Sequence, residues 1–200
     1  RRNCPSFKRL FKVIKSFKSP DLKDQKQQLR KEHAELRRFI PDKSKLKKSK
    51  IICDLLLNNK HVIGAKNILL YYPTLDEVDI KPVINYCWEK GKNVYFPFIK
   101  EVKIGKADGI DDLRDFNSRF KEPSVQAEEL PLLKLDLVIL PGVGFDNNRN
   151  RLGRGKGWYD KYIGTLKHKP ILIGVCFKEQ LLEEIPYEKH DIRTDEVLTA

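Results

Sequence analysis

Short apolar runs alternate with helical stretches over most of this chain, and this alternation restricts the fold more than any other feature. Strand-like runs, rich in β-branched and aromatic residues, occupy 67–72, 93–98, 135–140 and 171–177. Helical patterns occupy 80–90, 157–166 and 179–184. Continuous apolar strands separated by helices of this length predict a mostly parallel sheet with helices on both faces. The predicted class is α/β, as a single three-layer, Rossmann-like domain.

Two more helices are predicted ahead of the first strand. One pattern runs from Asp21 to Phe39 and ends before Pro41, which cannot continue a helix. The second runs from about Ser44 to Asn58 and is expected to bury its apolar residues, which are Leu46, Ile51, Ile52, Leu55 and Leu56. Residues 99–134 show no clean period, so the sequence predicts no element there.

Positive charge is concentrated at the start of the chain. Residues 1–50 hold 18 Lys and Arg against 5 acidic residues, whereas residues 51–200 hold 22 against 23. Residues 1–20 are basic and contain no acid, which fits a transit peptide, a membrane-surface helix or a solvated leader. We therefore expect a basic tail at 1–20 and a single folded domain at 21–200. The neutral body argues against a nucleic-acid-binding protein, although a basic arm leaves that alternative open.

Two classes of protein are disfavoured by composition. No apolar run approaches the roughly 18 to 20 residues of a membrane span, so we expect no membrane association. The four cysteines, at 4, 53, 87 and 176, show no short paired spacing, so neither a zinc site nor a disulfide framework is indicated. Cys87 and Cys176 lie inside apolar segments and are expected to act as small core residues in a reducing compartment.

A glycine-rich segment follows the strand that ends at Leu140. It reads Asn150-Arg-Leu-Gly-Arg-Gly-Lys-Gly-Trp-Tyr-Asp160, so that alternate glycines frame two cations. Glycine permits close backbone approach, the cations supply charge, and a helix that opens near Gly157 adds its positive end. In α/β sheets, ligands bind where loops leave the carboxyl ends of strands. The segment therefore predicts a phosphate site, the alternative being a solvated surface turn.

Two common phosphate motifs do not fit this segment. A P-loop has Ser or Thr after its Gly-Lys pair, whereas Gly157 follows Lys156 here. No stretch matches the spaced glycines of the dinucleotide fingerprint. Trp158 and Tyr159 offer aromatic faces to a ring system, and Asp160 is a candidate magnesium ligand.

These residues resemble a known family. The segments 141–146 (Pro-Gly-Val-Gly-Phe-Asp) and 150–160 are similar to the signature of the 5-formyltetrahydrofolate cyclo-ligases, with Trp158 where a tyrosine is more usual. The stretch from Lys26 to Arg30, the acidic patch at 76–79 and the pair Glu122-Pro123 agree in order. The resemblance covers about residues 22–198.

The resemblance implies an ATP- and magnesium-dependent enzyme that converts 5-formyltetrahydrofolate into 5,10-methenyltetrahydrofolate. ATP would phosphorylate the formyl oxygen, and the neighbouring amine would then attack the activated carbon. The expected ligands are the folate and ATP, with no nucleic acid or membrane partner, and we expect a monomer. The cytoplasm is the expected location, or a mitochondrion or other organelle if residues 1–20 belong to a transit peptide.

The resemblance also assigns residues to roles. The ATP site would comprise Lys26, Arg30, Arg151, Leu152, Gly153, Arg154, Gly155, Lys156, Gly157, Trp158 and Tyr159. The folate site would comprise Tyr72, Glu77, Arg154, Trp158 and Tyr159. The catalytic cations would be Arg151, Arg154 and Lys156, and the magnesium ligands Asp160 and Asp191.

Each assignment has a plainer alternative. Lys26 and Arg30 lie one helical turn apart, and such pairs are usually a solvated helix face. Asp160 alone suits the start of a helix, and Asp191 alone suits a turn. A catalytically inactive relative that only binds folate is a further alternative, against which the intact cations argue.

Overall fold

A computed structural model describes residues 21–124 and 134–200. The expected basic tail at 1–20 therefore lies outside the described residues, as does the stretch 125–133. Among the described residues, no helix combines the length and the apolar character needed to cross a bilayer.

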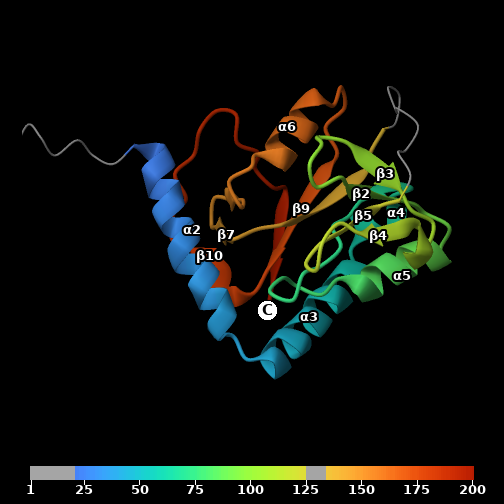
Figure 1. The fold of residues 1–200 in the computed structure, drawn as a ribbon, viewed down its shortest axis with the longest axis horizontal. Helices are drawn as coiled ribbons and strands as arrows, with labels where there is room; N and C mark the ends of the chain where they lie inside the picture. The colour runs from blue at the N-terminus through green and yellow to red at the C-terminus, as the bar shows by residue number, and fades with distance from the viewer. Residues whose placement is uncertain (1–20, 125–133) are drawn as a thin grey trace, which may run out of the picture.

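The main sheet has six strands in the order β11-β9-β6-β1-β2-β3 (Figure 1). Their bounds are β1 (Asn67–Leu69), β2 (Asn93–Pro97), β3 (Ile104–Lys106), β6 (Leu137–Pro141), β9 (Ile171–Cys176) and β11 (Glu196–Thr199). Neighbouring strands are parallel except for β2 and β3, which are antiparallel. The predicted mostly parallel sheet is confirmed.

Helices cover both faces of this sheet. The helices of the described residues are α2 (Leu22–Phe39), α3 (Asp42–Leu57), α4 (Lys60–Gly64), α5 (Lys81–Glu89) and α6 (Trp158–Thr165). Helices α3, α4 and α5 pack on one face, and α6 packs on the other. Along β6, Leu137 and Ile139 face the first group, whereas Val138 and Leu140 face α6. Because both faces are covered, the strands are apolar throughout, and the three-layer α/β prediction is confirmed.

Helix α2 stands apart from the main sheet. Figure 1 shows it leaning away from α3, which it meets at one end. The two residues of α2 that are buried are both cations, Lys26 and Arg37. Leu29 packs against a small core beside a three-stranded sheet made of β10 (Leu181–Leu182), β7 (Gly144–Asp146) and β8 (Arg151–Leu152). The two predicted N-terminal helices are therefore present, but charges contribute much of the buried surface of the first.

The predicted helix at 179–184 is wrong. The chain forms a short 3-10 helix, η2 (Lys178–Gln180), and then strand β10. The buried Gln180 amide donates to the carbonyl oxygens of Gly142 and Val143, at 2.9 and 3.0 Å, and its Oε1 accepts from the Phe177 N–H. These side-chain bonds to a distant loop end the helical turn, and Leu182 then pairs with Asp146.

Two other regions differ from expectation. In α3, Ile52 and Leu56 are fully buried, but Leu46 is 64% exposed and Ile51 and Leu55 are each 43% exposed, so the predicted buried face is narrower. Within the stretch 99–134, the described residues form β3, the 3-10 turn η1 (Ile110–Asp112), and the hairpin of β4 (Leu113–Asp115) and β5 (Lys121–Pro123). These strands are three residues long and partly charged, so they leave little periodic pattern.

The close packing of β9 gives a stability prediction. A Cβ atom at Gly174 would lie 2.4 to 3.0 Å from ring atoms of Phe145, which is fully buried. We expect Gly174→Ala to lower the free energy of unfolding by about 1 to 3 kcal/mol through overpacking. Gly164→Ala is the matched control, because a Cβ there meets nothing within 4 Å, and a helical Gly→Ala change stabilises by up to about 1 kcal/mol. Urea unfolding of both variants tests this, and equal midpoints would contradict it.

Candidate active site

The glycine-rich loop links β8 to α6 at the carboxyl edge of the main sheet. Gly155 and Gly157 have φ angles of +96° and +62°, and Gly157 is the residue that precedes the first turn of α6. L-residues with side chains rarely adopt such angles, so glycine is needed at both positions. Helix α6 therefore begins where the sequence predicted, with its amino end beside the loop.

Arg151 connects this loop to the elements on either side of it. Its side chain is 6% exposed, and Nη2 donates to Asp160 Oδ2 at 3.0 Å. The other terminal nitrogen donates to the carbonyl oxygen of Pro141 at 3.3 Å, and the guanidinium lies 5.3 Å from the centre of the Tyr159 ring. Arg151 thus fixes the loop to α6 and to the end of β6. The neighbouring Leu152 side chain is buried in the small core, so only its backbone can contact a ligand.

Helix α2 brings two predicted cations to the site, with different partners. Arg30 Nε donates to the carbonyl oxygen of Gly153 at 2.8 Å. Lys26 Nζ instead donates to Glu188 Oε2 at 2.7 Å and to Asp191 Oδ2 at 2.5 Å. Burial alone would lower the Lys26 pKa, but these two carboxylates outweigh it, so the pKa is raised. Lys26 and Arg30 are therefore part of a packed interface rather than a solvated helix face.

The two predicted magnesium ligands are linked through the backbone next to Asp191. Asp160 Oδ1 accepts from the backbone N–H of Ile192, the residue after Asp191, at 3.1 Å. Asp191 also accepts from the Glu188 N–H at 2.7 Å. Carboxylate oxygens are the donors that Mg²⁺ takes from proteins, so the donor chemistry fits this ion.

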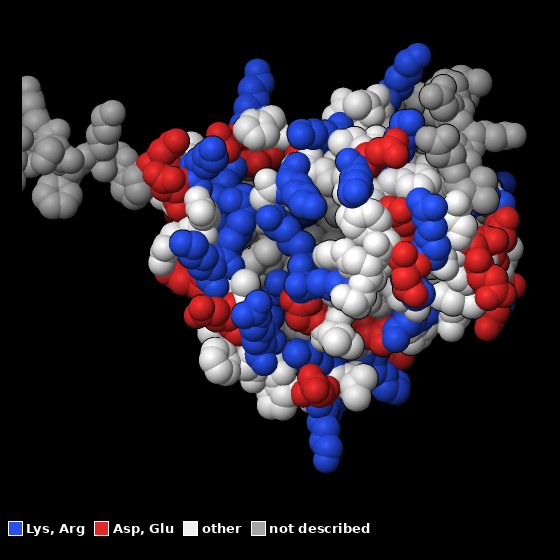
Figure 2. Space-filling view, viewed as in Figure 1, with Lys and Arg blue, Asp and Glu red and all other residues white. Residues whose placement is uncertain are grey.

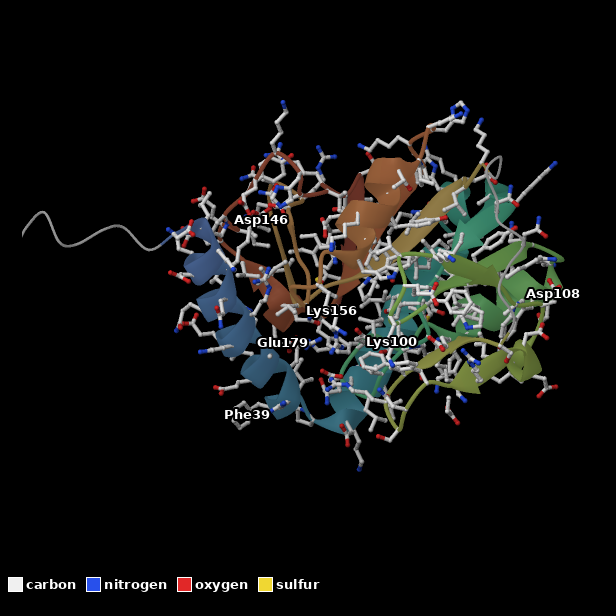
Figure 3. The ribbon with its side chains drawn as sticks, turned by 45° about the horizontal axis from the view of Figure 1, so that its top comes forward. Phe39, Lys100, Asp108, Asp146, Lys156 and Glu179 are labelled. Carbon is white, nitrogen blue, oxygen red and sulfur yellow. The ribbon has the colours of Figure 1, made fainter. Side chains whose placement is uncertain are left out.

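A cavity of about 180 Å³ opens in front of the glycine-rich loop. Figure 2 shows Lys and Arg gathered around a hollow near the centre of this face. Figure 3 places Lys156 toward the middle of the molecule. The predicted residues that line the cavity are Tyr72, Glu77, Arg151, Gly153, Arg154, Lys156, Gly157, Trp158 and Tyr159. The predicted residues outside its lining are Lys26, Arg30, Leu152, Gly155, Asp160 and Asp191.

Ring contacts and one hydrogen bond hold the aromatic wall of the cavity. Trp158 stacks on Tyr162 with ring centres 5.2 Å apart, and its Nε1 donates to the carbonyl oxygen of Glu101 at 2.6 Å. Trp158 also meets Tyr159 edge to face, at 5.0 Å. Burial raises the pKa of the Tyr159 phenol well above its usual value, so this hydroxyl is neutral.

Sequence reasoning missed several residues that line the cavity. Pro97 ends β2 and Phe98 and Ile99 follow it, whereas Phe120 and Lys121 lie on the β4–β5 side. The first group was detectable, because β2 is parallel to β1 and its carboxyl end reaches the same edge. The second group lies in the stretch without a readable period, so no comparable signal was available.

Glu77 and Arg154 meet at the mouth of the cavity, although 77 positions separate them. Arg154 Nη2 donates to Glu77 Oε1 at 2.8 Å. Glu77 Oε2 accepts from the backbone N–H and the hydroxyl of Thr74, at 3.1 and 3.0 Å. Burial alone would lower the Arg154 pKa, but Glu77 and Asp76 outweigh it and raise it. One arginine therefore connects the loop after β1 with the glycine-rich loop.

The chain matches a known family along nearly the whole described domain. A sequence model of the 5-formyltetrahydrofolate cyclo-ligase family matches residues 22–200. The chain belongs to this family. It is therefore a ligase of folate metabolism.

Relatives from other organisms are similar to this cyclo-ligase along most of their own length. A 5-formyltetrahydrofolate cyclo-ligase from Mus musculus is 31% identical over 187 residues, covering 86% of this chain and 92% of its own. One from Haemophilus influenzae is 28% identical over 182 residues, covering 88% and 97%. The solution structure of 5,10-methenyltetrahydrofolate synthetase from Aquifex aeolicus superposes with a TM-score of 0.75 at 27% identity, covering 87% of this chain and 89% of that one.

Proposed function

We propose that this cyclo-ligase uses ATP to convert 5-formyltetrahydrofolate into 5,10-methenyltetrahydrofolate. One observation carries the proposal: a single cavity is lined by aromatic rings, a carboxylate and the cationic glycine-rich loop. A flat pterin ring and a triphosphate can therefore meet in it. Family membership supports the folate half, and the loop supports the nucleotide half.

The folate side rests on Glu77, Tyr72 and the two aromatic residues that open α6. A carboxylate accepts hydrogen bonds from the adjacent ring N–H and amino groups of a pterin. Glu77 is held in place by Thr74, and its side chain is 8% exposed, so its direction is fixed before the substrate arrives. Trp158 and Tyr159 offer ring faces against which the pterin can pack.

The nucleotide side rests on the glycine-rich loop and the start of α6. Backbone N–H groups at a helix start bind phosphate oxygens, and Lys156 and Arg154 supply mobile charge beside them. Arg30 on α2 bonds to the Gly153 carbonyl of the loop, and Arg151 bonds to Asp160 on α6. Arg151 then acts by shaping the loop, whereas Arg154 and Lys156 face the reacting groups.

Asp160 and Asp191 are the residues that would hold magnesium. When bound, the ion would neutralise phosphate charge during transfer. Lys26 is paired with Asp191 and Arg151 with Asp160, so the ion would share these carboxylates with two cations. Both carboxylates are fixed by backbone N–H groups, so their positions do not depend on the cations alone.

The chemistry requires an activated oxygen. A formyl oxygen is a poor leaving group, so it first attacks the terminal phosphorus of ATP and displaces ADP. The neighbouring amine then attacks the formyl carbon, the carbon–oxygen bond breaks, phosphate leaves with that oxygen, and the amine loses its proton. Phosphoryl transfer depends on positioning and charge neutralisation rather than on a protein nucleophile. A site of Arg, Lys, Gly and Asp suits that requirement.

An isotope experiment tests this route. With substrate that carries ¹⁸O in the formyl group, one labelled oxygen is expected in inorganic phosphate for each turnover. Absorbance of the methenyl product, followed with and without ATP, gives the number of turnovers. Label that appears in water and not in phosphate would rule out the phosphorylated intermediate, while product formed without ATP would rule out the nucleotide altogether.

A further inference from the structure

Arg37 is a buried charge that the site described above does not use. It lies in the last turn of α2, two turns beyond Arg30, and its side chain is 4% exposed. Its Nη2 lies 3.2 Å from Asp76 Oδ2. An isolated buried charge is strongly destabilising, so such a residue is retained in a core only with a partner. Asp76 is that partner, and it immediately precedes Glu77.

Arg37 belongs to a cluster of three arginines and two carboxylates. Arg119 Nη2 donates to both oxygens of Asp76, at 2.8 and 3.0 Å. Arg154 Nη2 lies 2.8 Å from Glu77 Oε1 and 3.7 Å from Asp76 Oδ1. The cluster therefore holds one more positive than negative charge. If Arg154 leaves, Asp76 keeps Arg37 and Arg119, and Glu77 keeps its two hydrogen bonds from Thr74.

Asp76 needs a cation throughout the working pH range. Burial alone would raise the pKa of its carboxyl, but the Thr74 hydrogen bond and the charges of Arg37, Arg154 and Arg119 lower it to about 2. The carboxylate is therefore ionised near neutral pH. If it lost one of its fixed partners, its attraction for the remaining arginines would increase.

The arginines differ in how far they can move. Arg154 lines the cavity, and its side chain is 35% exposed, so it can turn toward a ligand. Arg37 lies behind Asp76, between α2 and the loop after β1, and its burial fixes it there. Arg119 is 47% exposed but does not line the cavity, so Arg154 is the cation that can leave the cluster for a ligand there, whereas Arg37 stays.

We infer that Arg37 is a positioning residue, which neutralises Asp76 from behind so that Arg154 can leave the carboxylates and bind nucleotide phosphate in the cavity. This inference rests on the proposed function, because it requires an anionic ligand at the glycine-rich loop. Without Arg37, Asp76 keeps only Arg119 as a close partner, so it attracts Arg154 more strongly and the ligand must compete with this carboxylate for the Arg154 guanidinium. Arg37 thus acts on the ligand through Arg154, without touching it.

A double-mutant cycle tests the inference through binding rather than turnover. Calorimetry measures the affinity for ATP with magnesium in wild type, Arg37→Met, Arg154→Ala and the double variant. We expect Arg37→Met to weaken binding about tenfold when Arg154 is present, the scale of one charge-assisted hydrogen bond. When Arg154 is already alanine, the loss is expected to be less than about twofold, because the two residues act through one another.

Equal weakening in both backgrounds, or none in either, would overturn the inference while leaving the proposed function intact. Wild-type protein that binds no ATP would instead overturn both. Arg38→Met is the matched control, because Arg38 is the neighbouring arginine and is exposed. It is expected to bind ATP as wild type does.

A second variant keeps the test valid if Arg37→Met folds poorly. Arg37→Met with Asp76→Asn removes both the cation and the charge that it neutralises. This pair is expected to restore ATP affinity to within about twofold of wild type, since residue 76 then carries no charge that attracts Arg154. A double variant that unfolds cooperatively but binds ATP as weakly as Arg37→Met would show that Arg37 acts in another way.

Discussion

Lys156→Ala is expected to lower turnover by roughly 100- to 1000-fold, the scale seen when one preorganised group that stabilises developing charge is removed. Lys156 is exposed at the cavity rim, between the two glycines with positive φ angles. Its ammonium group can therefore follow a phosphoryl group in transfer. Steady-state assays of methenyl product at saturating ATP and folate measure the effect.

The matched control is Lys167→Ala. Lys167 is also an exposed lysine, but it lies beyond the end of α6 and outside the cavity lining. It is expected to keep full turnover. Both variants should unfold like wild type, since neither lysine is part of the core. Near-normal turnover of Lys156→Ala at saturating ATP would show that the loop is not the phosphate site.

Removal of divalent metal is expected to lower turnover at least about 100-fold, because a metal that neutralises a transferring phosphoryl group supplies several kcal/mol. Excess EDTA followed by readdition of Mg²⁺ measures this loss and its recovery.

Asp160→Asn is expected to raise the Mg²⁺ concentration for half-maximal turnover by about 10-fold or more, because a carboxylate ligand becomes a neutral amide.

Asp108→Asn is the control for the metal experiment. Asp108 is exposed and lies at the edge of the molecule, away from Lys156 (Figure 3). Its Mg²⁺ requirement is expected to match wild type. Thermal unfolding separates a metal effect from the loss of the Arg151–Asp160 ion pair. Full turnover of wild-type enzyme in EDTA would exclude a magnesium site at Asp160.

Much of the fold was predictable because its signals are local. The apolar runs that became β6 and β9 are buried on both faces, so their pattern is continuous and short. The start of α6 was predictable because glycine marks it. The wrong helix at 179–184 has the opposite cause. Gln180 bonds to carbonyl groups almost 40 positions away, and no local pattern indicates such a partner.

The sequence predicted which residues belong to the site, but not which of them contact one another. Periodicity indicates parallel strands without giving their order, so it does not reveal that β1 lies next to β6. That adjacency brings Glu77 to Arg154. The pairing of Lys26 with Asp191 likewise depends on how α2 docks, which no spacing within either segment encodes.

Helix α2 is joined to the rest of the protein largely through cations that also serve the site. Its buried residues are Lys26 and Arg37, and Arg30 bonds to the glycine-rich loop. The sheet and its covering helices form their core without these charges. Docking of α2 onto the site is therefore an equilibrium separate from folding of the sheet. Ligands that bridge α2 and the loop stabilise the docked helix by mass action. Catalytic competence and global stability can therefore change independently, and a protein with an intact core can still be inactive because one helix is undocked.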